Sequence, residues 1–414
     1  MGLGLAGLYA YNVAGYRRAA GEGFELPDPP TADSSQFAGL VEALGPAPCR
    51  EGNRVTILRN GDEIFPAMLE AIASASDAIN FSTYIYSAGD IAPRFADALA
   101  ARASEGIEVN VLLDAEGCKK MDRGLMEQLR SAGATVVWFR PPRWHNVHKL
   151  NNRMHRRLLI VDGRLGFMGG VGIDKGWEGN AEDPEHERES HLRIEGPAVR
   201  DLVAAFLENW TEGTSSLLSP SHFPELAAFE DGIQLQVARS EASSGTRGLE
   251  KLLWAAVAAS RERFWVTTAF FAPRRAFVDV LCGAARRGVD VRILTGGVPQ
   301  DKQVARTAGQ LSYGKLLEAG VRIFEYQQAK MHAKVITIDG AWANVGSSNL
   351  DNRSLTLNDE INISMQHTGA VSELERHFRE DVEVSREMDL QRWRRRPLRQ
   401  RAQERATELI RQSL

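Results

Sequence analysis

Two histidines, each followed two residues later by a cation, are the side chains in this sequence best suited to chemistry. His155 and Arg157 lie in the segment MHRRLLIVDG, and the segment MHAKVITIDG contains His332 and Lys334. Because side chains alternate between the two faces of a strand, each histidine shares a face with its cation. Two cations can neutralise a phosphodiester, and imidazoles can exchange a phosphoryl group and protons. The pattern therefore indicates transfer at a phosphodiester, a chemistry that needs no metal ion or other cofactor.

This chemistry gives the two histidines different roles. One imidazole attacks phosphorus and forms a covalent phosphohistidine, while the other protonates the departing alkoxide and later deprotonates the incoming alcohol. Each imidazole also needs its tautomer fixed, usually by a carboxylate on the second ring nitrogen. The candidates are Glu189 in RESHLRIEG and Glu360 in LNDEINI. We assign each glutamate to the histidine of its own segment, because both lie on the strand-like stretch that follows that histidine.

An aspartate and then a turn of small residues follow each apolar run. Asp162 comes after LLIV, and Asp339 comes after VITI. Each aspartate is an odd number of residues from its histidine, so we expect it to hold the following turn rather than to act on substrate. The small residues of GGVG at 169–172 and GSSN at 346–349 allow the backbone to approach a ligand closely.

Between its two ends the chain repeats itself, and the repeat predicts the fold. The first copy contains AIASASDAINFSTYIY, FADALAARASEGIEVNVLLDAEG, LMEQLRSAGATVVWFR and MHRRLLIVDG. The second has, in the same order, AAVAASRERFWVTTAFF, FVDVLCGAARRGVDVRILTGG, YGKLLEAGVRIFEYQ and MHAKVITIDG. Alternating helices and apolar strands predict an α/β fold with two duplicated halves, each a mostly parallel mixed sheet flanked by helices. Pseudo-two-fold symmetry would bring one equivalent piece from each half to a site at the junction.

Length and composition allow this arrangement. With 414 residues, 43% of them apolar, the chain can bury a large core. Its three cysteines lack the spacing of a disulfide or zinc framework. We place an N-terminal apolar segment and linker at 1–45, the two halves at 46–225 and 226–385, and a basic C-terminal tail at 386–414.

The two ends of the chain suggest contact with a membrane. The N-terminal segment MGLGLAGLYAYNVAGYRRAA is apolar up to Arg17, lacks a cleavage site and is slightly short for a spanning helix. We interpret it as an interfacial anchor or as a frayed terminus. The tail is rich in arginine, with Trp393, Leu398, Leu409 and Ile410 interspersed. Such a tail binds an anionic membrane surface, forms a solvated helix or binds nucleic acid, and the apolar N-terminus favours the membrane.

The second histidine segment carries a specific family resemblance. HAKVITIDGAWANVGSSN matches in full the H-x-K-(x)4-D-(x)6-G-S-x-N signature of the phospholipase D superfamily, and the chain most closely resembles bacterial cardiolipin synthases. The segments NNRMHRRLLIVDGRLGFMGG, HLRIEGPAV, YGKLLEAGVRIFEY and SSNLDNRSLTLNDEINI extend the resemblance over both halves. It implies transfer of a phosphatidyl group from one phospholipid, typically phosphatidylglycerol, to the hydroxyl of another, giving cardiolipin. It also implies a place at the bacterial inner membrane, peripheral or N-terminally anchored.

The resemblance further implies roles for individual residues. His155 is then the nucleophile, and His332 is the general acid and base. The other candidate catalytic residues are Arg157, Asp162, Lys334, Asp339, Glu189 and Glu360. The candidate substrate-binding residues are Ser347, Asn349, Gly170 and Asn358.

The first segment departs from the family pattern at three positions. Arg157 stands where lysine is usual, Gly172 where the motif has asparagine, and Glu189 where related synthases tend to have aspartate. Arginine keeps the charge but is longer and planar, and the missing asparagine removes a hydrogen-bond donor. The altered segment favours a non-catalytic lipid-binding scaffold as one alternative. The other is a phosphodiesterase that hydrolyses phospholipid or nucleic acid, since water competes with alcohol at the second step.

Overall fold

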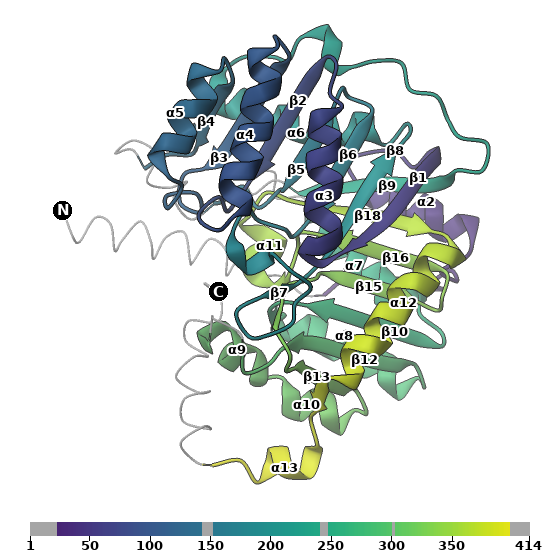
Figure 1. Cartoon of the computed structure of the whole chain (residues 1–414). Helices are drawn as coiled ribbons and strands as arrows, with labels where there is room; N and C mark the ends of the chain where they lie inside the picture. The colour runs from purple at the N-terminus through teal and green to yellow at the C-terminus, as the bar shows by residue number, and fades with distance from the viewer. Residues whose placement is uncertain (1–22, 143–151, 241–246, 300–302, 398–414) are drawn as a thin grey trace, which may run out of the picture.

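Two α/β halves, joined through a shared sheet, make up the molecule (Figure 1). The computed structural model describes residues 23–142, 152–240, 247–299 and 303–397. The apolar N-terminal segment and the last residues of the arginine-rich tail lie outside the described residues, so the membrane contact predicted for them stays a prediction.

The secondary-structure elements repeat from one half to the other. The first half contains β1 (Arg50–Arg59), α3 (Asn60–Ala73), β2 (Ala78–Thr83), α4 (Ile91–Ser104), β3 (Glu108–Asp114), α5 (Arg123–Ser131), β4 (Thr135–Phe139), β5 (Leu158–Val161), β6 (Leu165–Gly169), β7 (Glu187–Arg188), β8 (Ser190–Glu195) and α6 (Val199–Thr214). The second half contains β9 (Ile233–Ser240), α7 (Gly248–Ala259), β10 (Arg263–Thr268), β11 (Phe271–Ala272), α8 (Arg275–Arg286), β12 (Asp290–Gly296), α9 (Gln303–Gln310), α10 (Tyr313–Glu318), β13 (Arg322–Tyr326), β14 (Lys330–Met331), β15 (Val335–Ile338), β16 (Trp342–Gly346), β17 (Leu350–Asp351), α11 (Asn352–Thr356), β18 (Glu360–Gln366), α12 (Thr368–Glu383) and β19 (Ser385–Glu387).

The strand order makes the duplication explicit. Within the described part of the chain, fifteen strands form one sheet in the order β19-β13-β12-β10-β15-β16-β18-β9-β1-β8-β6-β5-β2-β3-β4. The halves meet at the antiparallel pair β1 and β9. Outward from β1 the order is β8, β6, β5, β2, β3, β4, and outward from β9 the equivalent strands β18, β16, β15, β10, β12, β13 follow. The predicted α/β fold with two duplicated halves is confirmed.

The direction of the strands differs from the mostly parallel sheet that the sequence predicts. Parallel pairing in this sheet is confined to β2–β3–β4 and to β10–β12–β13. The remaining neighbours are antiparallel. Parallel neighbours need a crossover, which helices provide only in these two stretches, whereas short turns join β5 to β6 and β15 to β16. The expectation of a mostly parallel sheet is therefore wrong.

A shared hydrophobic core fixes the two halves against each other. Strand β16 contacts β6 and β8, and β18 contacts β6, so the sheet curls back on itself at the junction. The cluster of buried side chains that fills this junction includes Leu192 and Phe206 from the first half and Val345 and Phe378 from the second. The segments that precede β5 and β15 are consequently held on one packed body.

The segment expected to be a linker contains a helix that packs on the second half. Helix α2 (Ser35–Leu44) begins after Ser34, whose hydroxyl accepts the N–H of Phe37. Phe37 and Val41 are buried in the core of the second half, and Phe37 meets Trp342 edge-on. Residues numbered before the first half thus belong to the core of the second.

The tail also begins inside the fold. Strand β19 pairs with β13 at the edge of the sheet, and Arg386 forms an ion pair with the buried Glu325. Helix α13 (Leu390–Arg394) follows, and its Trp393 is buried against Tyr313, with ring centroids 5.3 Å apart. The interpretation of Trp393 as an apolar membrane anchor is therefore wrong, because its ring is already packed in the core.

We predict that Phe37→Ala lowers the free energy of unfolding by about 3–5 kcal/mol, the cost of truncating a large aromatic side chain in a core. Denaturant unfolding followed by circular dichroism measures this change. The matched control Gln36→Ala replaces an exposed residue of the same helix and should alter the free energy by less than about 0.5 kcal/mol. An equally small effect of Phe37→Ala would mean that α2 contributes nothing to the core.

Candidate active site

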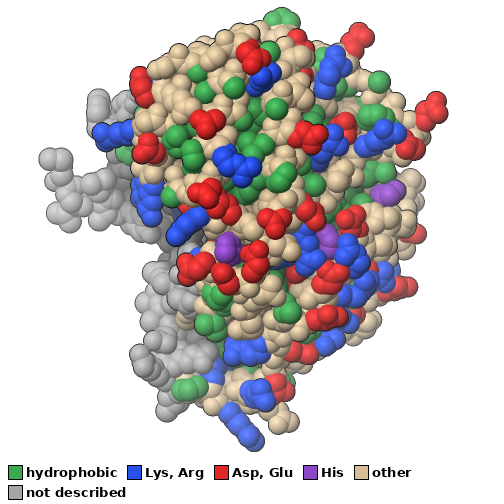
Figure 2. Space-filling view, viewed as in Figure 1, with side chains coloured by type: hydrophobic (Ala, Val, Ile, Leu, Met, Phe, Trp, Pro, Cys, Tyr) green, Lys and Arg blue, Asp and Glu red, His purple; other side chains and the backbone are tan. Residues whose placement is uncertain are grey.

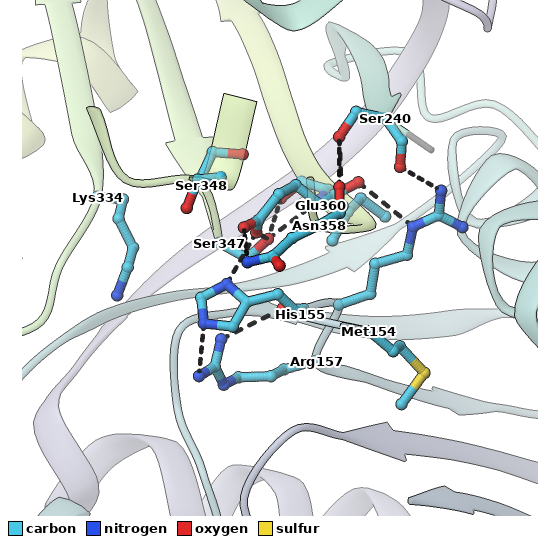
Figure 3. A network of polar contacts seen from close by, with 12 residues as sticks. Met154, His155, Arg157, Ser240, Lys334, Ser347, Ser348, Asn358 and Glu360 are labelled. Atoms are coloured by element: carbon cyan, nitrogen blue, oxygen red, sulfur yellow. Dashed lines mark hydrogen bonds and ion pairs between the residues drawn. The ribbon is translucent and has the colours of Figure 1, made fainter. Parts of the chain in front are cut away.

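The two histidines enter the site from equivalent places in the sheet. His155 lies three residues before β5, and His332 lies three residues before β15. Their side chains are mostly buried, with 11% and 12% of the surface exposed. Figure 3 shows Lys334 of the second half beside His155 and Arg157 of the first, and the positive charge of Arg157 helps to lower the pKa of Lys334. The structure therefore brings the two predicted half-sites together.

Each histidine takes its carboxylate from the opposite half. Nδ1 of His155 lies 2.9 Å from Oε2 of Glu360, and Figure 3 shows this contact. Nδ1 of His332 lies 2.6 Å from Oε2 of Glu189. The assignment of each glutamate to the histidine of its own half is therefore wrong. A repeat read along the sequence cannot distinguish the two pairings, because each copy offers the same set of groups.

The exchange between halves follows from the backbone. The N–H of His155 donates to the carbonyl of Asp359 at 2.9 Å, and the N–H of His332 donates to the carbonyl of Arg188 at 2.8 Å. Asp359 and Arg188 directly precede the two glutamates. Strand β14 also pairs with β7, and Met154 forms the equivalent bridge to Asp359. Each histidine segment is thus paired with the carboxylate-bearing segment of the other half.

Each cation contacts the histidine of its own half. One terminal nitrogen of Arg157 donates to the His155 carbonyl at 3.2 Å, and the other lies 3.2 Å from Nε2 of the ring. A guanidinium only donates, so this geometry leaves the lone pair on Nε2 and the proton on Nδ1, facing the carboxylate. Nζ of Lys334 contacts the His332 carbonyl and lies 2.8 Å from Nδ1 of that ring.

Burial sets the acid–base properties of the site. Loss of hydration raises the pKa of Glu189 and of Glu360 to about 7. The same loss lowers the pKa of Lys334 to about 8, and it also lowers the pKa of Arg157. Nearby opposite charges act against each shift, with Lys334 the first of them for Glu189. The site therefore holds groups that titrate close to neutral pH, as sites of proton transfer do.

Two of the four predicted substrate-binding residues contact Glu360. Oγ of Ser347 donates to Oε2 of Glu360 at 2.5 Å, and Nδ2 of Asn358 donates to Oε1 at 3.3 Å. Both side chains therefore hold the carboxylate that orients the first histidine. Asn349 is buried two residues after Ser347, and its Oδ1 has no hydrogen-bond partner in the described part of the chain.

The fourth of them, Gly170, stands where the second half has Ser347. A Cβ atom at Gly170 would lie 2.2 Å from Oε2 of Glu189 and 3.0 Å from Nδ1 of His332. This position therefore has room for glycine alone, and the first half offers no hydroxyl here to the Glu189 carboxylate. The two histidine–glutamate pairs are equivalent in geometry but differ in how the carboxylate is held.

A tryptophan ring occupies the place of the asparagine that the first half lacks. A Cβ atom at Gly172 would lie 2.9 Å from Cζ3 of Trp177 and 3.0 Å from Cβ of Ile85. Trp177 ends a short 3-10 helix, is 5% exposed, and meets the His332 ring edge-on with centroids 5.2 Å apart. The first half has exchanged a hydrogen-bond donor for an aromatic contact to the histidine of the second half.

Sequence reasoning missed both aromatic contacts to the histidines. Tyr84 meets the His155 ring edge-on at 5.2 Å, just as Trp177 meets His332. Tyr84 directly follows β2, at a position where the repeat has Ala269 after β10. A comparison of the two copies residue by residue would have found Tyr84, whereas the spacing around Trp177 carries no such signal.

The two motif aspartates lie at the far ends of β5 and β15 from the histidines. The carboxylate of Asp162 accepts the N–H groups of residues 76–78, and that of Asp339 accepts those of residues 261–263. Burial raises the pKa of Asp162, but these N–H donors outweigh it and leave the pKa lowered. Both aspartates hold backbone, as predicted. The prediction that each holds the turn that follows it is wrong, because the loops they hold precede β2 and β10.

Comparisons with known proteins agree with this geometry. A family model described as "Cardiolipin synthase, PLD-like domain" matches residues 68–210 and 253–382. A cardiolipin synthase of Geobacillus thermodenitrificans (strain NG80-2) is 32% identical over 374 residues, which are 90% of this chain and 74% of the relative. Cardiolipin synthase 1 of Bacillus cereus is 31% identical over 389 residues, which are 91% of this chain and 76% of the relative.

Solved structures show the same fold at low identity. Phosphatidylserine synthase from Haemophilus influenzae Rd KW20 has a TM-score of 0.66 at 14% identity, over 92% of this chain and 100% of that one. Polyphosphate kinase from Porphyromonas gingivalis has a TM-score of 0.52 at 13% identity, over 82% of this chain and 49% of that one.

The duplicated sheet and the paired histidine segments define a phospholipase D-like enzyme. With the family model and these relatives, the chain belongs to the cardiolipin synthase family. It is accordingly a phospholipid phosphatidyltransferase, and the family resemblance of its sequence is confirmed.

We predict that Gly172→Asn, which restores the asparagine of the motif, lowers kcat for phosphatidyl transfer by roughly 100-fold, as small misplacements of reacting groups do. The new side chain would displace the Trp177 ring and with it His332. The double variant Gly172→Asn/Trp177→Ser should regain part of this loss, because it removes the clash. Gly39→Asn, at a position where an added Cβ would meet no other part of the molecule within 4 Å beyond its own helix, serves as control. Higher activity of Gly172→Asn would contradict the packing argument.

Proposed function

We propose that the enzyme transfers a phosphatidyl group from one phosphatidylglycerol to another, giving cardiolipin and glycerol, through a phosphohistidine on His155. The observation that carries the proposal is the pair of crossed histidine–glutamate contacts, each with its own cation, in one buried site. Two oriented imidazoles and two fixed cations supply a nucleophile, an acid–base group and charge neutralisation. The proposed chemistry requires no cofactor.

In the first half-reaction, Nε2 of His155 attacks phosphorus, and the P–O bond to the departing glycerol breaks. His332 gives its proton to the glycerol oxygen as that bond breaks. Arg157 and Lys334 neutralise the non-bridging oxygens, whose charge is greatest in the transition state. For this step Arg157 must exchange its contact with Nε2 for one with phosphate, which frees the lone pair for attack.

In the second half-reaction, a hydroxyl of the acceptor lipid gives its proton to His332 and attacks phosphorus. The P–N bond to His155 then breaks, and both histidines return to their starting states. Water entering at this point would give phosphatidic acid, so exclusion of water decides between transfer and hydrolysis.

The assignment of His155 as nucleophile is supported by the contacts of its ring. Arg157 donates toward Nε2, which requires a free lone pair on that nitrogen. Glu360 on the other side accepts hydrogen bonds from Ser347 and Asn358, which favour its charged form. A charged Glu360 stabilises the cationic ring of a phosphohistidine.

We further propose that the enzyme works at the anionic surface of the bacterial inner membrane, as a peripheral or N-terminally anchored protein. The support is the lipid substrate together with the apolar start and arginine-rich end of the sequence. Among the residues that the structure describes, no helix has the length and apolar character needed to cross a membrane. Acidic and basic side chains are interspersed over the face in Figure 2, which does not favour a nucleic-acid groove on that face.

The test is to incubate the purified full chain with labelled phosphatidylglycerol in mixed micelles. We expect cardiolipin and glycerol as products, and a quench in denaturant at mildly alkaline pH, where the P–N bond survives, should leave the lipid phosphate on His155. His155→Ala should abolish both the product and the label. If phosphatidic acid is the only product, the enzyme is a hydrolase rather than a transferase. A label on His332 would mean that His332, and not His155, is the nucleophile. If no lipid is turned over, the result would favour the alternative of a non-catalytic lipid-binding protein.

We predict a bell-shaped pH dependence of kcat/KM with its maximum between about pH 7 and pH 8. Below about pH 7 the two glutamates take up protons and no longer support the imidazoles, and above about pH 8 Lys334 loses its charge. Lys334→Arg keeps a cation at all these pH values, so its alkaline limb should move upward by more than one unit. An unchanged alkaline limb would show that Lys334 does not set it.

A further inference from the structure

A turn at the start of α3 lies behind the histidine of the opposite half. Asn60, the first residue of this helix, is buried and has a left-handed backbone with φ of 58°. Asparagine adopts this conformation more readily than most residues, and its amide can bond to nearby backbone. No feature of the sequence motifs points to this residue, and it touches neither histidine.

Asn60 holds the backbone of Glu189 from both sides. Its Oδ1 accepts the N–H of Glu189 at 3.0 Å, and its own N–H donates to the Glu189 carbonyl at 3.2 Å. The Glu189 side chain continues from this fixed point to Nδ1 of His332, 2.6 Å away. A shift of the Asn60 turn would therefore move the carboxylate that faces Nδ1 of His332.

The same turn holds the segment that carries Trp177. Nδ2 of Asn60 donates to Oδ1 of Asn180 at 2.7 Å and to its carbonyl at 3.2 Å. The next two residues of the turn extend the contact, because the N–H of Asp62 donates to Gly179 and a Cβ at Gly61 would lie 2.0 Å from the Trp177 carbonyl. Two neighbours of the His332 ring from the first half, Glu189 and Trp177, are thus tied to one turn.

The second half has an equivalent residue at the end of β9. In the strand register, Ser240 pairs with Glu360 as the residue after β1 would pair with Glu189. Oγ of Ser240 accepts the N–H of Glu360 at 3.3 Å, as Figure 3 shows. Both halves therefore cap the backbone N–H of the glutamate with a side-chain oxygen from the end of the equivalent strand.

The two glutamates differ in the other hydrogen bonds that their carboxylates accept. The Glu360 carboxylate also accepts hydrogen bonds from Ser347 and Asn358. Glu189 has Gly170 at the position of that serine, and its carboxylate accepts the N–H of Ser190. The position of Glu189 therefore depends more on its backbone cap than the position of Glu360 does.

We infer that Asn60 is a positioning residue for the general acid–base His332, acting through Glu189 and the Trp177 segment, and that Ser240 plays the lesser, equivalent part for His155. The inference rests on the roles proposed above for the two histidines. The side-chain amide and the backbone N–H of Asn60 form hydrogen bonds with Glu189 and Asn180, so its loss should appear in kcat and in proton transfer to the leaving group.

The experiment compares two substrates that differ in their need for an acid. Phosphatidylglycerol releases an alkoxide that must be protonated, whereas the p-nitrophenyl ester of phosphatidic acid releases a stable anion. Asn60→Gly keeps the left-handed backbone and removes the amide. We expect it to slow the first turnover of phosphatidylglycerol by about 100-fold, a typical contribution of general acid catalysis, while the burst of nitrophenolate falls less than about fivefold. Ser240→Ala should slow both substrates by a similar, smaller factor, because it acts through the nucleophile.

Two further variants keep the outcomes distinct. Asp28→Gly changes another left-handed residue, one exposed on the N-terminal segment, and should leave both rates unchanged. If Asn60→Gly does not fold, Asn180→Ala removes one partner of the amide and should show the same preference with a smaller loss. Equal losses for both substrates would reduce Asn60 to a structural role. Absence of any nitrophenolate release and of any phosphatidylglycerol turnover by the unaltered enzyme would instead refute the proposed function itself.

Discussion

Burial of two carboxylates at the junction of the halves is the constraint on which the rest of the structure depends. A buried carboxylate is costly unless an ionic or hydrogen-bonding partner faces it. Glu189 and Glu360 each face a histidine of the other half, so the partner on the imidazole side always comes from the opposite half. The shared core and the backbone pairing of each histidine segment bring the partners together. The contacts that orient the catalytic histidines therefore also hold the two halves together.

Duplication supplied two similar half-sites, and later substitutions made them unlike. The strand order of the two halves is the same, and so is the position of each histidine before its strand. The side chains around the two glutamates differ, with Ser347 in one half and Gly170 in the other. Such differences suit a reaction in which one imidazole forms a bond to phosphorus and the other moves only protons.

Much of the fold and of the site could be predicted from local patterns. The repeat and the alternation around the histidine motifs identified the duplicated α/β halves and the groups that now meet in the site. The crossing of the carboxylates could not be predicted, because it depends on which half each segment pairs with. Trp177 and Asn60 were missed for a related reason. Trp177 contacts His332 and Asn60 holds Glu189 through tertiary contacts, each from a stretch of sequence with no periodic or motif signal.

The strand directions show a different limit. Helices that end before apolar strands indicate crossovers, and the structure has these in the outer part of each half. The strands nearest the junction are joined by short turns, which leave little trace beyond a few small residues. Local sequence patterns therefore predicted which stretches form helices and strands better than they predicted whether neighbouring strands pair in parallel or antiparallel.

Helix α2 has a consequence for how the molecule is made. Its Phe37 packs against Trp342, a residue of the second half that the ribosome adds about 300 residues later. At the usual speed of protein synthesis this is a delay of roughly 15–60 s. Helix α2 also contacts α7, which is made more than 200 residues after it. Until these segments emerge the apolar face of α2 lacks its native partners, so the nascent chain must keep this helix exposed or shielded by a chaperone.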